Sequence, residues 1–445
     1  MAEATHSFPP SFLWGTATAG YQVEGNSLNT DWWEWEQGVG RIAQGHKSAR
    51  ACDWWEGRRW REDFDRAAGD GHAALRMSVE WSRVEPTPAR WDEDALDHYR
   101  QMILGLRERG LEPLVTLHHF VNPRWVAERD AWETGEAVTL FERYTRKVVK
   151  ALGEHVRLWC TINEPNVYLM FGWLKGLWPP GKHDLRLVPQ VAQNILKAHA
   201  AAYHAIHALQ PDARVGLAIH VRPIEPAHPG FRPDAWAART QFNLFSGLFP
   251  DAIQTGRLRQ ALGPSVRVPQ AKGTQDYFGL NYYTAELARF DLTNPGELFT
   301  RRSFPPDAEP DDEGQWTAAY PPGFYQALKW ACTQGLPIYV TENGVGDAAD
   351  RMRPRYILTH LRELWKAVNF NWGVRGYFYW SLVDNFEWER GWTHRFGLYA
   401  LDTQTLARSP RRSAQLYAEI CRSSSISSDM AARYAPELLE TMFPG

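Results

Sequence analysis

Two short segments of the chain place a glutamate beside an amide, directly after an apolar run. Glu164 stands in TINEP, residues 161–165, and Glu342 stands in TENG, residues 341–344. Two carboxyl groups that face each other can cleave a glycosidic bond, because one protonates the leaving oxygen while the other attacks the anomeric carbon or activates water. Either glutamate alone is more often an ordinary capping or ion-paired carboxylate. The hypothesis therefore depends on a fold that brings the two together.

Eight short apolar runs, each followed by a helical pattern, indicate the elements that would position these glutamates. They occupy residues 12–17, 73–79, 112–117, 157–162, 215–219, 277–280, 338–341 and 376–380. Strands that alternate with helices are typical of a parallel sheet, and eight such strands close a barrel. We predict an α/β fold, a single (β/α)8 TIM barrel with its active site at the C-terminal ends of the strands.

Polar and ionisable residues gather at the C-terminal ends of these runs. Since all these ends point to one face of a barrel, residues hundreds of positions apart converge there. The set includes Gln22 soon after the first run, then Arg76, His118, His119, Asn163, Glu164, His220, Asn281, Tyr282, Tyr283, Glu342, Asn343 and Trp380. If Glu164 and Glu342 face each other across the mouth, a carboxyl separation of about 5 Å would fit a retaining mechanism.

The chain has no obvious internal boundary before its C-terminal end. We predict a catalytic domain over residues 1–421 and a helical C-terminal extension over residues 422–445, where the sequence is first rich in serine. An apolar stripe within residues 92–110 predicts a helix that ends at Gly110 and packs on the sheet. Residues 223–235 and 292–323 are rich in Pro, Gly, Asp and Glu. We expect them to form long surface loops near the mouth.

Composition and charge exclude several classes of partner. The net charge is −3 with scattered Lys and Arg, which disfavours nucleic acid. No run of eighteen apolar residues and no basic, apolar leader is present, so we predict a cytoplasmic protein without a membrane segment. The 22 tryptophans can supply planar faces for sugars.

Neither a cofactor nor a metal is expected from the remaining motifs. The segment GVGRIA, residues 38–43, matches a dinucleotide fingerprint on paper, but it follows a Trp- and Glu-rich stretch rather than a strand. His199, His204 and His207 share one predicted helix without an acidic partner at a ligand spacing. Only one of the neighbours His118 and His119 can face the mouth. The four cysteines lie far apart and are interpreted as buried reduced thiols.

The chain resembles family 1 glycoside hydrolases, the β-glucosidase family, from residue 12 to about residue 421. The resemblance lies in FLWGTATA at 12–19, QVEG at 22–25, RMS at 76–78, NEP at 163–165, NYY at 281–283, TENG at 341–344 and the stretch 380–388. It implies that Glu164 is the acid/base and that Glu342 forms a covalent glycosyl-enzyme intermediate. The implied activity is a retaining β-glycosidase that removes terminal non-reducing β-D-glycosyl residues by double displacement. A β-glucosidase is favoured, with β-galactosides and β-fucosides as side substrates.

The same resemblance implies roles for the residues around the two glutamates. Arg76 and Tyr283 would hold Glu342 ionised and oriented, and Asn281 would lie near the acid. A cation and a phenol donor both favour a carboxylate, which agrees with this assignment. The glycone hydroxyls are assigned to Gln22, His119, Asn163, Glu387 and Trp388, with Trp380 as a stacking floor.

Three stretches bear on the substrate. The resemblance implies Trp-Asp-Leu-Pro after His119, but this chain has FVNP at 120–123, which alters a wall near the glycone and leaves the preferred sugar open. Residues 171–182, with Trp173 and Trp178, are expected to shape the aglycone entrance. Trp32, Trp33, Trp35, Trp54 and Trp55 are interpreted either as part of that entrance or as packing under loops. Glu387 would repel a phosphate, which favours an unphosphorylated glycone. By the same resemblance, the presence of the acid Glu164 implies that the substrates are ordinary O-glycosides.

Two rival functions stay open at this point. A carbohydrate-binding protein could keep the barrel without catalysis, although both glutamates are present. A transglycosylase would share the intermediate and use a sugar hydroxyl instead of water. For every alternative the predicted partners are small-molecule β-glycosides or short oligosaccharides, and the oligomeric state is left open.

Overall fold

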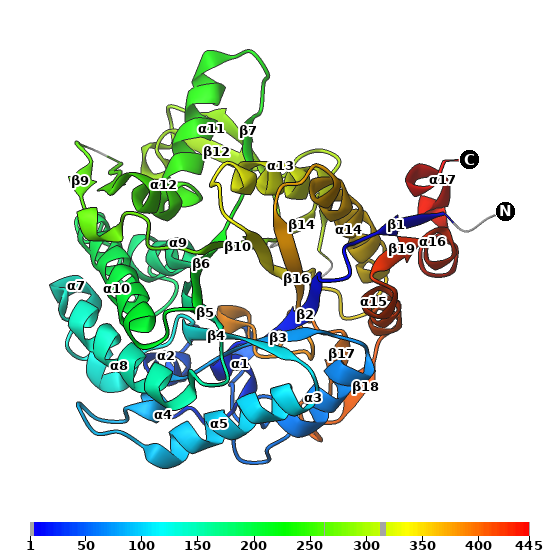
Figure 1. The fold of residues 1–445 in the computed structure, drawn as a ribbon. Helices are drawn as coiled ribbons and strands as arrows, with labels where there is room; N and C mark the ends of the chain where they lie inside the picture. Colours follow the sequence, from blue (N-terminus) through cyan, green and yellow to red (C-terminus); the bar gives the residue numbers. More distant parts are fainter. Residues whose placement is uncertain (1–3, 262, 312–316, 445) are drawn as a thin grey trace.

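Eight parallel strands close into a barrel at the centre of the molecule. The structure, a computed structural model, describes residues 4–261, 263–311 and 317–444. Around the barrel the strands follow the order β10-β15-β16-β2-β3-β4-β5-β6 (Figure 1). Their bounds are β2 Leu13–Ala17, β3 Ala74–Ser78, β4 Glu112–His118, β5 Leu158–Asn163, β6 Arg214–His220, β10 Tyr277–Tyr282, β15 Ile338–Asn343 and β16 Val374–Trp380. The predicted TIM barrel is confirmed, and each of the eight predicted runs is a strand.

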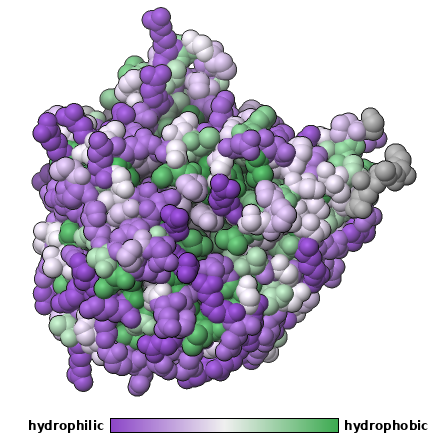
Figure 2. Space-filling model, viewed as in Figure 1, coloured by the Kyte–Doolittle hydropathy of each residue, from purple (hydrophilic) through white to green (hydrophobic). Residues whose placement is uncertain are grey.

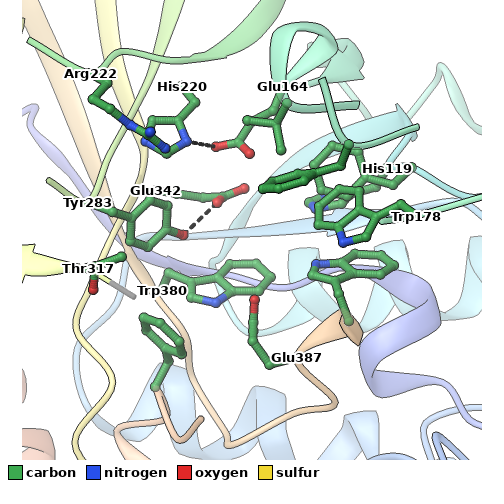
Figure 3. Close-up of a pocket in the computed structure, with 15 residues that line it drawn as sticks. His119, Glu164, Trp178, His220, Arg222, Tyr283, Thr317, Glu342, Trp380 and Glu387 are labelled. Carbon is green, nitrogen blue, oxygen red and sulfur yellow. Dashed lines mark hydrogen bonds and ion pairs between the residues drawn. The ribbon is translucent and has the colours of Figure 1, made fainter. Parts of the chain in front are cut away.

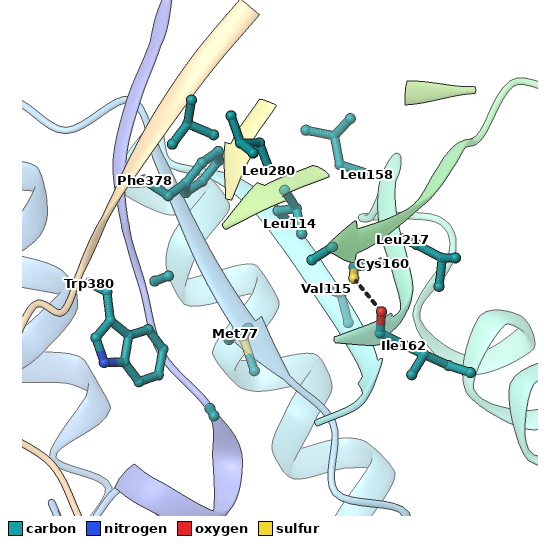
Figure 4. Close-up of a cluster of buried hydrophobic side chains, with 14 of the residues drawn as sticks. Met77, Leu114, Val115, Leu158, Cys160, Ile162, Leu217, Leu280, Phe378 and Trp380 are labelled. Carbon is teal, nitrogen blue, oxygen red and sulfur yellow. Dashed lines mark hydrogen bonds between the residues drawn. The ribbon is translucent and has the colours of Figure 1, made fainter. Parts of the chain in front are cut away.

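Side chains fill the barrel interior, which explains why its strands could be predicted from runs of apolar residues. Met77, Leu114, Leu280 and Phe378 are buried in one cluster that joins opposite sides of the barrel (Figure 4). Helices cover the outer face of these strands, so both faces of each strand are buried. The apolar run is therefore continuous rather than alternating.

The longer helices follow the strands in turn. They are α3 Trp60–Gly69, α5 Glu93–Glu108, α8 Glu136–Leu152, α10 Val188–Leu209, α11 Arg232–Phe245, α12 Leu248–Thr255, α13 Pro321–Cys332, α14 Arg353–Asn369 and α15 Arg412–Ser423. The predicted helix within residues 92–110 is α5. The Asp92 side chain caps it by accepting a 2.9 Å hydrogen bond from the backbone N–H of Ala95. Gly110, with φ 73°, follows its end in a conformation that suits glycine.

Short elements surround the barrel. The helical ones are α1 Gly20–Val23, α2 Asp31–Gln37, α4 Trp81–Val84, α6 Arg124–Ala127, α7 Ala131–Thr134, α9 Pro165–Leu169, η1 Ala43–Gly45, η2 Met170–Leu174, η3 Pro269–Ala271, η4 Pro295–Glu297 and η5 Trp388–Arg390. Two small antiparallel pairs join β8 Arg257–Leu258 to β9 Val266–Arg267 and β17 Tyr399–Leu401 to β18 Arg408–Pro410.

The interpretation of residues 223–235 and 292–323 as plain loops is wrong in part. They contain β7 Ile224–Pro226, β12 Thr300–Ser303, β13 Glu309–Pro310 and β14 Ala318–Ala319. β7 and β12 flank β11 Glu286–Phe290 in a three-stranded sheet that projects with α11 from the barrel (Figure 1). Prolines and short lengths hid these strands, and β7 in addition pairs with a strand about 60 residues away in sequence. Residues 312–316 of the second predicted loop lie outside the described residues.

The two ends of the chain are joined by a strand pair. β1 Thr5–Ser7 pairs antiparallel with β19 Ser425–Ser427, and both lie at one edge of the molecule (Figure 1). α16 Ser428–Tyr434, η6 Pro436–Leu438 and α17 Leu439–Met442 follow. Residues 422–445, predicted as an extension, begin within the last turn of α15, and the domain boundary stays a prediction.

The face of the molecule drawn in Figure 2 is mainly hydrophilic, with small groups of hydrophobic residues between charged and polar ones. Across residues 4–261, 263–311 and 317–444, no helix combines the length and apolar character needed to cross a bilayer.

Candidate active site

One cavity lies where the C-terminal ends of the barrel strands meet. It encloses about 610 Å³ including the space at its mouth. Figure 3 shows Glu164 and Glu342 on its walls, with Trp380 and Glu387 at the side away from Arg222. The residues lining it are His119, Phe120, Glu164, Val167, Phe171, Trp178, His220, Arg222, Tyr283, Thr317, Glu342, Trp380, Glu387, Trp388 and Phe396. Six of the strand-end residues singled out from the sequence thus converge on it, namely His119, Glu164, His220, Tyr283, Glu342 and Trp380.

Local irregularities of the backbone aim both glutamates at this cavity. The pairing of β10 with β15 shifts between Leu280 and Asn281, which sets Asn281 beside Glu342. Such shifts redirect side chains at the rims of barrels. Glu164 lies just past β5 with φ 39°, a left-handed conformation that is strained for a residue with a side chain. Pro165 then starts α9, which suits its fixed φ and missing N–H.

Glu342 is held by two donors. A terminal guanidinium nitrogen of Arg76 donates a 2.7 Å hydrogen bond to Oε1, and the Tyr283 hydroxyl donates one of 2.7 Å to Oε2. Arg76 is fully buried, so the ion pair is shielded from water. Burial leaves the pKa of Glu342 above its usual value, although the contacts with Arg76, Tyr283 and Asn281 each lower it. The contacts therefore favour the ionised form that a nucleophile requires.

The nearest polar atoms to the Glu164 carboxyl group belong to neutral side chains instead. The Asn281 amide donates a 2.9 Å hydrogen bond to its Oε1, and His220 Nδ1 lies 3.7 Å from the same oxygen. Burial, and then the charge of Glu342, raises the pKa of Glu164 to about 8. This carboxyl group is thus mostly protonated at neutral pH while Glu342 remains paired with Arg76. Two carboxyl groups with such unequal surroundings can divide the acid and nucleophile roles.

Asn163 sets the orientation of His119. Its Oδ1 accepts from Arg76 at 2.6 Å and from Asn281 at 3.2 Å, so its Nδ2 faces His119 Nε2 at 3.1 Å. Because an amide nitrogen can only donate, His119 Nε2 accepts and Nδ1 carries the ring proton. Burial keeps the ring neutral by lowering its pKa well below the usual value. Nδ1 has no partner among the described residues, which leaves one donor for a ligand.

The opposite side of the cavity combines an indole face with carboxyl and amide groups. Trp380, Glu387 and Trp388 line it, and Gln22 lies behind Glu387. The Gln22 amide donates to Glu387 Oε2 at 3.2 Å, to Asn385 Oδ1 at 3.0 Å and to the Phe386 carbonyl at 2.9 Å. Every predicted site residue therefore lines the cavity or contacts one that does.

Sequence reasoning missed four lining residues, namely Val167, Arg222, Thr317 and Phe396. Arg222 could have been predicted from the sequence, because it stands two positions after His220, one of the polar residues at the C-terminal ends of the apolar runs. Thr317 and Phe396 come from long connections, whose course no periodicity predicts. Phe120 and Trp178 lie in the two segments whose sequences differ from the family pattern. Both line the cavity, with ring centroids 4.8 Å apart.

Other expected features lie away from this cavity. His118 bonds to Asn122, and His199 contacts Thr161 and the Thr274 carbonyl. The segment 38–43 follows helix α2 and not a strand. Trp32 packs behind the wall on Trp178 and Trp388, with ring centroids 5.4 and 4.8 Å away.

All four cysteines are free, but Cys332 is only partly buried, which corrects the expectation of four buried thiols. No group of three metal-ligating side chains occurs within the residues that the structure describes.

The comparison with protein families decides the assignment. The sequence profile described as Glycosyl hydrolase family 1 matches residues 4–426. This chain belongs to glycosyl hydrolase family 1. It is therefore a glycoside hydrolase of a family that acts with retention, and the family named from the sequence is confirmed.

Relatives of known structure or activity agree with this assignment. The β-glycosidase from Pyrococcus horikoshii superposes with a TM-score of 0.90 at 40% sequence identity, over 97% of this chain and 98% of its own. The β-glucosidase from Thermotoga maritima in complex with deoxynojirimycin gives a TM-score of 0.86 at 30% identity, over 94% of this chain and 99% of its own. A β-galactosidase from Pyrococcus woesei is 30% identical over 93% of this chain and 96% of its own length.

Proposed function

We propose that this family 1 hydrolase is a β-glucosidase that removes terminal non-reducing β-D-glucosyl residues from small β-glycosides or short oligosaccharides, with β-galactosides and β-fucosides as side substrates. The observation that carries the proposal is the unequal pair of buried carboxyl groups on one cavity. Glu342 is paired with Arg76 and Tyr283, whereas Glu164 is bonded by the neutral Asn281 amide. The relatives named β-glucosidase and β-galactosidase support the choice of sugars.

In the first step we assign nucleophilic attack to Glu342. Its carboxylate bonds to the anomeric carbon while Glu164 gives its proton to the departing oxygen, so the glycosidic bond breaks and the aglycone leaves as an alcohol. The ester that forms has no negative charge on Glu342. The charge that raised the pKa of Glu164 is then gone, and Glu164 becomes the base for the second step.

In the second step Glu164 accepts a proton from water as the water oxygen attacks the anomeric carbon. The ester bond breaks, Glu342 is released as a carboxylate, and the sugar leaves with its original β configuration. Arg76 and Tyr283 are positioned to receive the returning charge, since both contact the Glu342 oxygens. No metal or cofactor takes part in this scheme.

We assign sugar binding to the side of the cavity with Trp380 and Glu387. An indole face can cover the axial hydrogens of a pyranose, and a carboxyl group can bond two neighbouring hydroxyls. His119 offers its Nδ1 proton to a further hydroxyl, because Asn163 holds the ring in that orientation. Burial and the neighbouring carboxyl groups of Glu389 and Glu342 raise the pKa of Glu387 well above its usual value, so this side of the cavity disfavours negative charge, which supports an unphosphorylated glycone. The cytoplasmic location stays a prediction.

The test is nitrophenol release from a panel of 4-nitrophenyl β-glycosides. Wild type should be fastest on the β-glucoside, slower on the β-galactoside and β-fucoside, and slowest on the β-mannoside. Glu342→Ala should abolish release and Glu164→Ala should reduce it strongly. The control Glu154→Ala alters a side chain that is 88% exposed and should leave the rate unchanged. A wild type that binds sugars but cleaves no β-glycoside would overturn the proposal, and added alcohol acceptors would expose a transglycosylase.

A further inference from the structure

One side of the cavity carries a cation that the proposed reaction does not use. Arg222 lies just past the end of β6 and lines the cavity together with His220 (Figure 3). One of its terminal nitrogens donates to Glu286 Oε1 at 3.1 Å, and its guanidinium lies 4.9 Å from the centre of the Phe245 ring. Its Nε is buried without a hydrogen-bond partner among the described residues. The guanidinium thus keeps donor capacity at the cavity.

The charge of Arg222 is only partly balanced by its neighbours. Glu286 is shared, because its other oxygen accepts from Arg302 at 3.1 Å. Arg302 in turn lies 3.7 Å from Glu297, which is also paired with Lys175. In this described network three cations face two carboxylates. An anion at Arg222 would meet a local excess of positive charge.

His220 adds an uncharged hydrogen-bonding atom beside this cation. Its Nδ1 side faces Glu164, and its Nε2 is buried with no partner in the described parts of the chain. Burial, together with the nearby Arg222 charge, lowers the pKa of His220 well below its usual value. The ring is therefore neutral at physiological pH and can bond a polar ligand atom without adding charge.

Both residues lie on the leaving-group side, an argument that rests on the proposed function. The acid must stand beside the departing oxygen, and Arg222 and His220 flank Glu164 on the side away from Trp380 and Glu387 (Figure 3). Val167 and Phe171, which follow Glu164 on α9 and η2, also line the cavity. Phe171 packs on Trp178 with ring centroids 4.7 Å apart, so the cavity has an apolar wall across from its cationic end, an arrangement suited to a ring that bears an anion.

We propose that Arg222 and His220 form an aglycone subsite selective for carboxylate-bearing leaving groups, such as hydroxylated aromatic acids. A guanidinium matches the geometry of a carboxylate with parallel N–H donors, and charged hydrogen bonds are stronger than neutral ones. The aromatic ring of such an aglycone would lie against Val167 and Phe171. Arg222 acts here as a specificity residue and takes no part in bond breaking.

The experiment compares 4-carboxyphenyl with 4-carbamoylphenyl β-glucoside, and the two 3-substituted isomers in the same way. Each pair has the same shape and differs in charge. We expect kcat/KM for the carboxylate to exceed that for the amide by about tenfold in wild type for at least one pair, since a charged hydrogen bond contributes about 1.5 kcal/mol or more. Arg222→Gln should bring the ratio to about one, and Arg222→Lys should give an intermediate ratio.

Arg301→Gln is the matched control, because Arg301 lies on β12 next to Arg302 but is 69% exposed and pairs with Asp291. It should leave the ratio unchanged. A second measurement compares inhibition by free 4-hydroxybenzoate with inhibition by 4-hydroxybenzamide. In Arg222→Gln, inhibition by the acid should weaken and inhibition by the amide should stay the same. Ratios of one or less for every wild-type pair would overturn the inference while leaving the β-glucosidase intact. A high ratio that survives in Arg222→Gln would also overturn it. Failure to cleave any of the four glucosides would instead count against the proposed function.

Discussion

Glu164 and Glu342 are both glutamates, but their side chains have different surroundings. Arg76 and Tyr283 contact Glu342, whereas Asn281 contacts Glu164. The sequence motifs identified both glutamates, and the resemblance to the family supplied their roles. Their pKa values depend on burial and on contacts between distant strands, which no local pattern contains.

The pKa of Glu164 predicts the alkaline side of the pH profile. In the proposed mechanism its carboxyl group works as an acid in the first step, so activity should be present while it is protonated and be lost as pH rises through its pKa of about 8. We expect kcat/KM for 4-nitrophenyl β-glucoside to fall above about pH 8 and to fall again at low pH as Glu342 is protonated. An activity that stays flat to well above pH 8 would contradict this assignment.

Tyr283→Phe should shift the acidic side of that profile. The hydroxyl donates to the Glu342 carboxylate at 2.7 Å, and its removal destabilises the ionised form and raises the pKa of Glu342. The acidic limb of kcat/KM should therefore move to higher pH, with a fall in kcat of about tenfold or more because a charge-assisted hydrogen bond is lost. Tyr339→Phe serves as a control, since Tyr339 is outside the cavity lining. An unchanged acidic limb would show that Tyr283 does not act on Glu342.

Glu164→Gln should reveal the acid role through its dependence on the leaving group. Loss of a general acid costs about 10² to 10⁴-fold when the leaving oxygen needs a proton. We expect kcat/KM to fall by that order for phenyl β-glucoside and far less for 2,4-dinitrophenyl β-glucoside, whose leaving group departs as an anion. Added azide should speed turnover of the activated substrate and give a β-glucosyl azide. Equal losses on both substrates would be inconsistent with an acid role.

At the scale of elements, the regular strands could be predicted and the irregular parts could not. Residues 277–280 and 338–341 were readable as apolar runs, but the register shift that sets Asn281 beside Glu342 has no sequence signal of its own. The strand β7 was missed because it gains its hydrogen bonds from β11, about 60 residues away in sequence, and β12 was missed because it is only four residues long and lies in a stretch rich in turn-forming residues.

The Asp92 cap of α5 offers a test of the scaffold. Asp92→Ala removes the acceptor for the Ala95 N–H and should lower the free energy of unfolding by about 1 kcal/mol. Thermal denaturation should show a lower Tm, while kcat and KM stay unchanged because α5 covers the outside of the barrel. Asp94→Ala, on the exposed first turn of the same helix, should have a smaller effect. Equal changes in the two variants would mean that the cap contributes nothing specific.

At the scale of the whole molecule, the barrel separates the site from the joined ends of the chain. The cavity lies at the C-terminal ends of the strands, whereas the Ser424 side chain accepts from the Trp14 indole near the amino end of β2. The sequence predicted a single barrel and a helical end. Only the structure shows that β1 and β19 join the two termini, because that pairing spans nearly the whole chain.

Deletion of residues 428–445 should therefore reduce stability without changing catalysis. It removes the buried side chains of Met430, Tyr434 and Met442, which pack against the barrel, so the free energy of unfolding should fall by several times the roughly 1.5 kcal/mol that one buried side chain contributes. The Tm should drop clearly, whereas KM for 4-nitrophenyl β-glucoside at a temperature well below Tm should match wild type. A changed KM in folded protein would place this end of the chain in the active site.

The central claim, that Glu342 becomes covalently glycosylated, is tested most directly by trapping the intermediate. With 2,4-dinitrophenyl 2-deoxy-2-fluoro-β-glucoside, the good leaving group permits the first step, while the electron-withdrawing fluorine slows both steps. Mass spectrometry of the digested protein should find one fluoroglucosyl group, on the peptide that contains Glu342, and none in Glu342→Gln. A fluoroglucosyl group on another residue would contradict the account. So would the absence of any such group in an enzyme that is active on β-glucosides.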